Sequence, residues 1–489
     1  MLIILFIALS IIQLAIGIDK TIALVGGVLA IFVVAHTLLK LSAVFRPSSK
    51  NVSAPNPKYN PFVSIHIACK NERSETVIKT VEALTKLDYK NYEVIVINNN
   101  NTDRDNWTKI RKYVKSCGKN FKFFHLDKMS GFKAGALNFL NDNHMDKKAE
   151  IEAIVDSDYI VTPDFLSETV TYFNDPKIGI VQAPQDYYNV NKYNVGLFYE
   201  FRSFFAIVMH QAQRLNLVTF TGTMGLIRTD FIKSGLRWNE WCITEDVEAG
   251  THINSLGYRG VYVDKSLGKG LMPYDYASLI KQRQRWAYGN MQIIYKDFSH
   301  VAFNKELSFK QKIAFLAQLV TWFHFELLIA VIYLGLQIIH FFGFSNIYIN
   351  TTDNLLLYLL AFSVLGNLLY FIVGLRKETK LINRVKAFLT HYGLIYVMSS
   401  SWLSYFLGLK LGFVVTKKEK SKKGMSFGQY SKEFIITILL IAALLIRFTK
   451  GGSMALDLSV TISFAIIEIS GIFYLHRALT KTNELDTSL

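Results

Sequence analysis

Cysteine is scarce in this sequence, with three residues in a chain of 489. Cys69, Cys117 and Cys242 are odd in number and lack the spacing of metal ligands, which argues against both a disulfide framework and a zinc site. We therefore expect reduced thiols in the cytosol.

Acidic residues are also in short supply, because 38 Asp and Glu face 54 Lys and Arg, a formal net charge of +16. Such an excess suits nucleic acid, anionic lipid, the cytoplasmic loops of a membrane protein or a phosphorylated substrate. The chain has no long basic tail and no basic stripe interleaved with aromatic residues, so we expect no nucleic-acid partner. The positions of the positive charges must decide among the other three.

Long apolar runs dominate the two ends of the chain, which is 51% hydrophobic overall. A helix of about 20 residues crosses the ~30 Å hydrocarbon core of a bilayer. Six runs are candidate spans: residues 2–17, 22–39, 313–341, 355–375, 434–448 and 458–475. No basic residue precedes the first run and a second run follows almost at once, so we interpret the first as a span and not as a cleaved signal peptide.

Lysine and arginine indicate the orientation of these spans, because cytoplasmic loops carry more of them. Basic clusters follow the second and fourth runs and precede the fifth, whereas residues 343–354 have none. A further apolar stretch at residues 387–412 has basic clusters on both sides and is too short to cross twice. We interpret it as a helix in the cytoplasmic interface, with a seventh span as the alternative. The third run contains His324 and Glu326, which should face protein or a wet path.

These patterns divide the chain into three parts. Residues 1–45 hold two spans, residues 46–310 form a cytoplasmic domain of ordinary polarity, and residues 311–489 form a second membrane domain. The whole is predicted to be a multi-pass protein of the cell membrane with six spans. Only a short tail follows residue 475, so we expect no appended regulatory domain.

The cytoplasmic domain alternates short apolar runs with helical patterns. Strands are expected at residues 62–68, 92–97, 121–126 and 151–155, with a helix at 74–87 after the first. This alternation is typical of a parallel, Rossmann-like α/β sheet with helices on both faces, which binds ligands beyond the carboxyl ends of its strands. The loops that follow the strands are therefore the candidate site.

Polar residues follow each of the first three strands. The first strand is followed by Glu72, the second by Asn98, Asn99 and Asp103, and the third by Lys133 between Gly131 and Gly135. A lysine flanked by glycines at the start of a helix can bind an anion through its charge and backbone N–H groups together. The ordinary alternatives are a surface turn for the asparagines and a plain helix start for the lysine segment.

Acidic residues occupy two further positions. Asp156 and Asp158 follow the fourth strand, where two carboxylates suit a hard divalent cation that also takes oxygens from a diphosphate. Farther along, Thr244, Glu245 and Asp246 open a helix. The alternatives are an Asx turn for the first pair and a helix cap for the second group.

The segment KQRQRWAYGN, residues 281–290, lies shortly before the third apolar run. Arginine pairs with phosphate oxygens through two parallel hydrogen bonds, so Gln282 and Arg285 are candidates for binding a diphosphate. Trp286 offers a flat apolar face. The alternatives are a membrane anchor for Arg285 and an interfacial belt position for Trp286.

Together these motifs resemble those of membrane-embedded family 2 glycosyltransferases of the cellulose synthase and hyaluronan synthase type, over nearly the whole chain. They are GFKAGALN at residues 131–138, DSD at 156–158, GTMGLIR at 222–228, TED at 244–246, QRQRW at 282–286 and FVVTKK at 413–418. The resemblance implies a GT-A-type domain inserted in a helical membrane domain. It also implies a processive, inverting β-glycosyltransferase that polymerises a nucleotide-activated sugar in the cytoplasm and extrudes the polysaccharide.

The resemblance further implies a role for each motif. Asp246 would be the catalytic base, Asp158 would hold Mg²⁺ or Mn²⁺, and Asp156 would bind the metal or the ribose of the substrate. Lys133, Glu245, Gln282 and Arg285 would contact the substrate, Trp286 would contact the acceptor sugar, and Thr416 and Lys418 would belong to a gating loop at residues 413–433 that closes over the donor.

One departure concerns the nucleobase. The family places an aspartate pair after the second strand, where uracil binds, but this chain has Asn98 and Asn99. Base recognition would be altered, or moved to Glu72 or Asp103. We expect a UDP-hexose donor in preference to a GDP-sugar, with the growing glycan as acceptor. The alternatives are a non-processive enzyme that adds a sugar to a lipid or lipid-linked acceptor, and a catalytically silent protein that gates a membrane channel.

Overall fold

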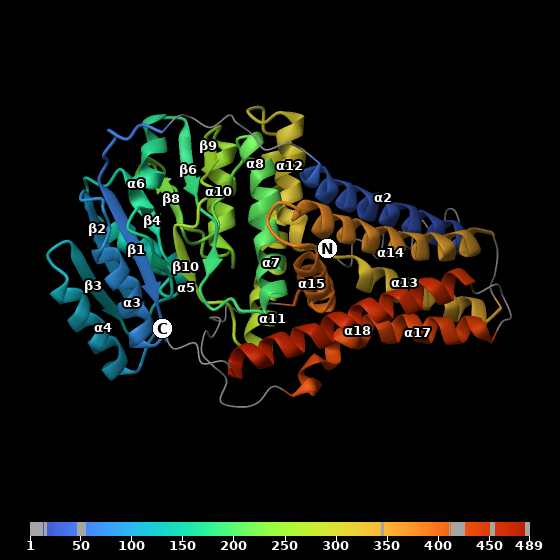
Figure 1. Ribbon diagram of the computed structural model, residues 1–489. Helices are drawn as coiled ribbons and strands as arrows, with labels where there is room; N and C mark the ends of the chain where they lie inside the picture. Colours follow the sequence, from blue (N-terminus) through green and yellow to red (C-terminus); the bar gives the residue numbers. More distant parts are fainter. Residues whose placement is uncertain are drawn as a thin grey trace.

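The computed structural model of the chain describes residues 13, 17–45, 55–343, 347–409, 411, 426–449 and 455–484. An α/β domain lies beside an elongated bundle of long helices, and further helices join the two (Figure 1). The first predicted span falls almost entirely outside the described residues, and so do the predicted gating residues Thr416 and Lys418.

The four predicted strands are confirmed, each to within two residues. They are β1 (Val63–Cys69), β2 (Tyr92–Asn99), β3 (Phe121–Leu126) and β4 (Ile151–Ile154), and helix α3 (Ser74–Thr85) follows β1. All four strands run parallel, in the spatial order β3-β2-β1-β4. Every residue of β2 and β4 is buried, including the acidic Glu93 and Glu152, because helices cover both faces of these mostly apolar strands.

The sheet is mixed, which corrects the expectation of a wholly parallel one. Its seven strands lie in the order β3-β2-β1-β4-β8-β6-β9, and β8 (Gly225–Arg228) runs antiparallel to both β4 and β6 (Ile178–Gln182). At the start of β8, Gly225 pairs with the last residues of both neighbours, Ile154 and Gln182. The loop before β8 therefore enters at the same edge of the sheet as the loop after β4.

The remaining strands are short. β9 (Arg259–Tyr262) pairs in parallel with β6 at the sheet edge. β5 (Ile160–Val161), β10 (Gly268–Gly270) and β7 (Asp186–Tyr187) form a separate three-stranded sheet in the order β5-β10-β7. This small sheet brings the segment after β10 close to the segment after β4.

Helices pack on both faces of the large sheet. In the α/β domain they are α3, α4 (Arg104–Ser116), α5 (Phe132–Asn143), α6 (Phe165–Thr169), η1 (Val170–Asn174), α9 (Thr229–Lys233) and α10 (Glu245–Ser255). Apolar side chains of α3 and α4 cover one face of the strands, and those of α5 and α10 cover the other. This three-layer packing leaves the carboxyl ends of the parallel strands open to ligands.

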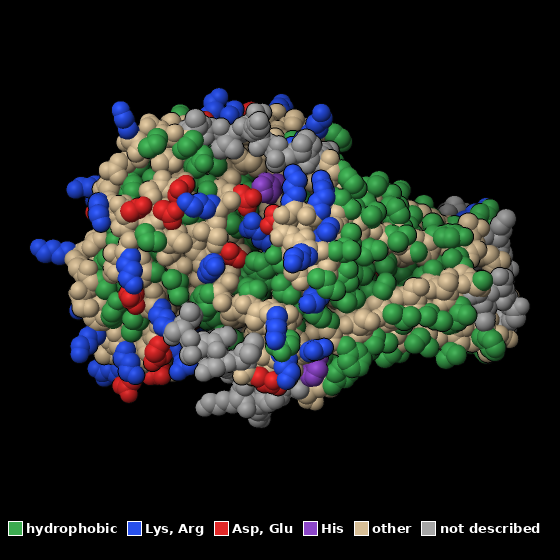
Figure 2. Space-filling model, viewed as in Figure 1, with side chains coloured by type: hydrophobic (Ala, Val, Ile, Leu, Met, Phe, Trp, Pro, Cys, Tyr) green, Lys and Arg blue, Asp and Glu red, His purple; other side chains and the backbone are tan. Residues whose placement is uncertain are grey.

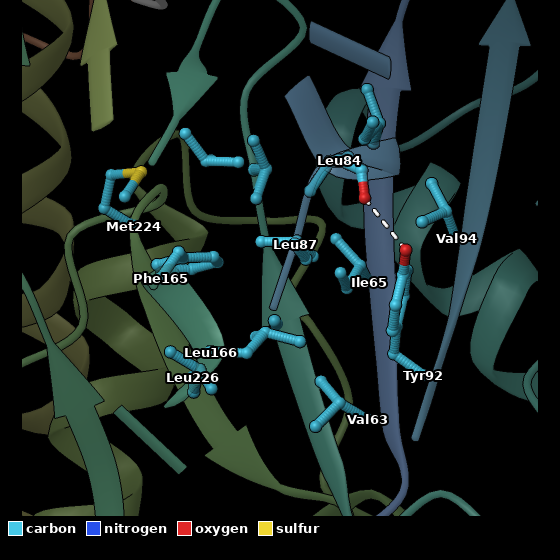
Figure 3. Close-up of a cluster of buried hydrophobic side chains, with 14 of the residues drawn as sticks. Val63, Ile65, Leu84, Leu87, Tyr92, Val94, Phe165, Leu166, Met224 and Leu226 are labelled. Atoms are coloured by element: carbon cyan, nitrogen blue, oxygen red, sulfur yellow. Dashed lines mark hydrogen bonds between the residues drawn. The ribbon is translucent and has the colours of Figure 1, made fainter. Parts of the chain in front are cut away.

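Figure 3 shows part of the core on the α3 face. Val63, Ile65 and Val94 project from the strands and have no exposed surface. The Tyr92 hydroxyl reaches the end of α3 and donates a hydrogen bond to the Leu84 carbonyl oxygen at 2.9 Å. Because full burial of such an apolar side chain contributes about 1.5–3 kcal/mol, the core holds the strand ends in fixed relative positions.

Ten further helices connect the α/β domain to the bundle or belong to the bundle, together with four short helical segments, among the described residues. They are α2 (Ile18–Val44), α7 (Val195–Ser203), η2 (Phe204–Met209), α8 (His210–Arg214), α11 (Tyr276–Ala302), α12 (Phe309–Leu319), η3 (Val320–Trp322), α13 (Glu326–Phe341), α14 (Ile347–Gly374), α15 (Leu381–Tyr392), α16 (Ile395–Phe406), η4 (Phe427–Phe434) and α17 (Ile435–Phe448), followed by α18 (Ala455–Glu484). On the face seen in Figure 2, the bundle shows many hydrophobic side chains and few charged ones, whereas charged side chains are spread over the α/β domain.

Three helices in the described part of the chain are long and apolar enough to cross a membrane: α2, the Asn350–Gly374 portion of α14, and α18. Helix α17, on the fifth predicted run, has 14 residues. At ~1.5 Å per residue it extends over about 21 Å, which is less than the ~30 Å hydrocarbon core.

The third predicted span is not one straight helix. The segments Phe309–Trp322 and Glu326–Phe341 meet at an angle of 72°. The break lies at residues 323–325, where Phe323 has extended backbone. His324 and Glu326 are buried at the break, so they face protein as expected, and Glu326 accepts a hydrogen bond from Ser363 at 2.8 Å.

The predicted interfacial helix at residues 387–412 is instead two helices, α15 and α16, with a break at Gly393 and Leu394. Gly393 lies directly against the backbone of Gly471 in α18, with no room for a side chain between them. This close approach, which the apolar pattern does not reveal, accompanies the break.

Helices α2 and α14 pack through small residues, as helices in membranes often do. A methyl group added at Gly366 of α14 would overlap with Thr37 of α2, which is itself buried. The contact therefore depends on the absence of a side chain at position 366.

We expect Gly366→Leu to lower the thermal midpoint of the purified protein in detergent by several degrees, because overpacking of a tight core costs about 1–3 kcal/mol. Gly335→Leu is the matched control, since nothing lies within 4 Å of the Cβ position at Gly335 on α13. Equal midpoints for the two variants, measured by scanning fluorimetry, would contradict the close α2–α14 contact.

Candidate active site

A cavity of about 680 Å³ opens where the carboxyl ends of the parallel strands meet α10 and α11. Ten of the residues predicted from sequence line it: Glu72, Asn99, Lys133, Asp156, Asp158, Glu245, Asp246, Gln282, Arg285 and Trp286. They come from six separate segments of the chain. The fold therefore brings the predicted acidic and basic motifs to one concave surface.

Two predicted residues do not line this cavity. Asn98 is fully buried, and its side-chain amide donates to the Lys70 carbonyl oxygen at 3.1 Å. Asp103 caps α4, where its carboxylate accepts a hydrogen bond from the Asn106 backbone at 3.0 Å. Of the polar residues that follow β2, Asn99 and Asn100 border the cavity.

Lys133 joins two of the loops. Its ammonium group donates to the Asp156 carboxylate and to the Gly222 carbonyl oxygen, both at 2.6 Å. The Asp156 backbone N–H in turn donates to the Thr223 hydroxyl at 3.0 Å. Burial would lower the pKa of Lys133, but the carboxylates around it, first that of Asp156, outweigh burial and raise the pKa above its usual value.

Asp158 is buried beside the small sheet. One of its carboxylate oxygens accepts a hydrogen bond from the Leu271 backbone, after β10, at 2.9 Å. Between the two aspartates, the Ser157 carbonyl oxygen accepts from Thr80 of α3 at 2.9 Å. The DSD loop is thus held on both sides, and both of its carboxylates border the cavity.

The carboxylates of Asp156 and Asp158 are suited to bind a hard divalent cation together with a ligand. In the described ranges no three His, Cys, Asp or Glu side chains are grouped closely enough to hold a metal ion by themselves. Mg²⁺, however, is commonly bound by one or two carboxylates together with phosphate oxygens and water. Asp156 and Asp158 could provide the carboxylates for such a site, and a bound diphosphate would have to supply further ligands.

Glu245 and Asp246 form the first turn of α10, facing Lys133 across the cavity. Burial raises the pKa of Glu245, and the neighbouring Asp246 carboxylate raises it further. Burial also raises the pKa of Asp246, against the opposing effect of Lys133 and Arg285. Two acids that share one partly dry site titrate as a coupled pair.

Gly222 determines how closely Asp246 approaches the loop before β8. The residue has a φ of +85°, in the left-handed region that favours glycine, and a methyl group there would overlap with the Asp246 carboxylate. The same glycine offers its carbonyl oxygen to Lys133. The glycine of the GTMGLIR motif is thus explained by close packing against an acid.

Helix α11 contributes one face to the cavity. Gln282, Arg285 and Trp286 are three and four residues apart, so their side chains emerge on the same side of the helix. The Trp286 ring centre lies 5.0 Å from that of Phe201 and 4.8 Å from that of Trp322. These rings form an aromatic wall at the end of the cavity nearest the bundle.

Several residues of the site were not found from sequence. Gln185 lines the cavity and donates to the Thr221 carbonyl oxygen at 2.6 Å, and the buried Gln182 accepts from the Thr221 backbone at 3.0 Å. Both follow or end β6, so inspecting the loop after that strand would have found them. Phe201 lies between Glu200 and Arg202, and Trp322 lies in the third apolar run, but neither belongs to one of the motifs.

Two family models match the chain. One, described as "Glycosyl transferase family group 2", matches residues 153–375, and the other, "Glycosyl transferase family 2", matches residues 64–236. Together they include the DSD, TED and QRQRW motifs.

The chain is also similar to curated proteins. It is 24% identical over 260 residues to glucomannan 4-beta-mannosyltransferase 7 of Arabidopsis thaliana, which is 52% of this chain and 47% of that protein. It is 27% identical over 250 residues to poly-beta-1,6-N-acetyl-D-glucosamine synthase of Staphylococcus epidermidis, which is 50% of this chain and 58% of that protein. The chain therefore spans about half the length of these relatives.

Among solved structures, a mannosyltransferase from Pyrobaculum calidifontis in complex with GDP-Man and Mn²⁺ is similar, with a TM-score of 0.50 and 16% sequence identity. The similarity covers 71% of this chain and 99% of that one. It shows a shared fold for the α/β domain.

We expect Mn²⁺ to bind at least about tenfold more tightly in the presence of UDP or GDP than alone, because Asp156 and Asp158 supply only part of its coordination. Electron paramagnetic resonance of free Mn²⁺ measures this. Asp158→Asn should weaken binding under both conditions, whereas Asp142→Asn, at an exposed ion pair with Arg237, should not. Equal affinity with and without nucleotide would contradict the shared site.

Proposed function

Because the chain belongs to glycosyltransferase family 2, we propose that it is a processive, inverting β-glycosyltransferase that builds a polysaccharide from a nucleotide-activated hexose. The sugar donor binds on the cytoplasmic side of a membrane, and the product crosses that membrane. One observation supports this proposal above the others: a single cavity is lined by Asp158, Asp246, Arg285 and the aromatic wall.

In the proposed reaction, Asp246 accepts the proton of the acceptor hydroxyl as that oxygen attacks the anomeric carbon. A carboxylate is a weak base for an alcohol, so proton transfer accompanies the attack and does not precede it. The raised pKa of Asp246 makes this carboxylate a better base than an exposed aspartate, at the cost of protonation at a higher pH. Attack from the face opposite the leaving group inverts the configuration.

The leaving nucleotide develops negative charge on its diphosphate. Arg285 stabilises this charge through paired hydrogen bonds, with Gln282 beside it on α11. Asp156 and Asp158 would hold Mg²⁺ or Mn²⁺, which neutralises diphosphate charge when bound. Lys133 contributes by holding Asp156 and the loop before β8 at fixed positions.

The proposed topology has six spans with the α/β domain in the cytoplasm. It is supported by the three long apolar helices and by the hydrophobic surface of the bundle. The basic residues Arg376, Lys377 and Lys380 follow α14 directly, as the positive-inside rule requires of a cytoplasmic end. The aromatic wall faces the bundle, which is where a growing glycan would leave the cavity.

The proposed donor is a UDP-hexose, and a GDP-hexose is the competing donor. Asn99 borders the cavity where the family carries an aspartate, and an amide can donate as well as accept hydrogen bonds from a base. The names of the relatives include both mannosyl- and N-acetylglucosamine-transferring enzymes, and the similar solved structure contains GDP-Man. A donor screen must therefore test both nucleotides.

We expect the purified full-length chain to form polymer from one of four radiolabelled donors: UDP-glucose, UDP-N-acetylglucosamine, UDP-glucuronate or GDP-mannose. Asp246→Asn should reduce polymer formation by about 10²–10⁴-fold, because it removes the general base. Nucleotide affinity should stay within about twofold of the wild type, since the amide leaves the diphosphate contacts intact.

Asp142→Asn serves as the control for this substitution and should retain full activity. A product of a single sugar on lipid would replace the processive function by the non-processive one. No product from any donor would reject the proposed activity, and polymer formation by Asp246→Asn would reject Asp246 as the base.

We expect the rate to fall as the pH is lowered through the titration of the acidic pair, because Asp246 acts only when deprotonated. Its raised pKa puts this fall at a higher pH than for an ordinary aspartate, near 3.9. The pKa of Glu245 is raised to about 7, partly by the Asp246 carboxylate, so Glu245 is already neutral while Asp246 titrates. Glu245→Gln should therefore leave the acid limb of kcat/KM in place, and an acid limb that moved to lower pH in this variant would contradict that order of titration.

A further inference from the structure

Arg283 has the largest of the fully buried side chains in the described part of the chain. It lies on α11 between Gln282 and Arg285, at a position to which the motif gives no role. Its guanidinium carbon is 4.3 Å from the ring centre of Phe201, 4.7 Å from that of Trp286 and 5.0 Å from that of Trp322. One buried cation therefore contacts all three rings of the aromatic wall.

Glu200 of α7 is the ionic partner of Arg283, and it is equally buried. Its second carboxylate oxygen lies 3.4 Å from Nδ1 of His391 in α15. The pair thus connects α11 to α7. The contact between Glu200 and His391 extends this connection to α15. Neither Arg283 nor Glu200 lines the cavity, whereas all three rings do.

Stability alone is a weak reason to keep such a pair. Removing two ions from water costs free energy that their attraction often fails to recover, and apolar replacements of similar volume are frequently as stable. What the pair does provide is geometry, because a guanidinium attracted to ring faces fixes the orientation of those rings. The rings concerned are those that face the proposed acceptor.

We propose that Arg283 and Glu200 are positioning residues that hold Phe201, Trp286 and Trp322 as a stacking surface for the acceptor sugar. This inference rests on the proposed glycosyltransferase function. Arg283 does not line the cavity, whereas the three rings do. The pair should therefore affect the binding of the acceptor and not the binding of the donor.

The test compares Arg283→Lys, which keeps the charge but loses the planar stacking group, with wild type. With a soluble oligosaccharide acceptor, we expect the KM for acceptor to rise about tenfold or more, while donor hydrolysis without acceptor stays within about twofold. A general loss of folded enzyme would instead lower the rate of sugar transfer and the rate of donor hydrolysis by the same factor.

Arg228→Lys is the matched control. Arg228 also stacks on an aromatic ring, 5.3 Å from the centre of Phe173, and donates to the Ile178 carbonyl oxygen at 2.7 Å. Neither Arg228 nor Phe173 lines the cavity. The control should leave the ratio of transfer to donor hydrolysis unchanged.

A second variant, Glu200→Gln/Arg283→Met, removes both charges and so leaves no unpaired buried ion. Its readout is independent of activity: the near-ultraviolet circular dichroism that Trp286 and Trp322 produce because their ring centres lie 4.8 Å apart. We expect this signal to fall to the level of Trp286→Phe.

Wild-type dichroism in the double variant, or an unchanged acceptor KM in Arg283→Lys, would overturn the inference. If the wild type transferred no sugar from any donor, the proposed function would fail separately. The dichroism of the double variant would then still decide whether the pair positions the rings.

Discussion

A single lysine holds together the two loops on which the cavity depends. Lys133 binds the Asp156 carboxylate of one loop and the Gly222 carbonyl oxygen of the other. Around it, Glu245 and Asp246 add two more acids to the same partly dry space. The Lys133 ammonium group offsets the repulsion among these carboxylates. The effect is large because a low dielectric strengthens the interactions between charges. The arrangement of charges therefore sets the arrangement of loops.

The antiparallel strand β8 is the second requirement. Its reversed direction brings Gly222 and Thr223 to the edge of the sheet where Asp156 lies. The segments at the ends of the parallel strands carry the residues proposed for the nucleobase and the cation, whereas α10 carries the proposed base and α11 carries the residues proposed for the diphosphate and the acceptor. The cavity forms where these two groups of elements meet, as open α/β folds usually arrange it.

Sequence reasoning located the parallel strands and most of the cavity because both depend on local patterns. Runs such as residues 94–97 are apolar throughout, and polar residues such as Asp156 follow where each strand ends. The direction of β8, the inward turn of Asn98 and the 72° break after Trp322 depend instead on contacts between distant segments. Arg283 was missed for the same reason: a buried partner, Glu200, lies 83 positions away.

The pairing of β8 has a consequence for protein engineering. This strand hydrogen-bonds to β4 on one side and to β6 on the other, and its first residue meets the last residues of both. A graft that exchanged β8 and α11 without both neighbouring strands would combine side chains of two different relatives in one sheet. Chimeras should therefore transfer residues 151–302 as one block, so that β4, β6 and β8 move together.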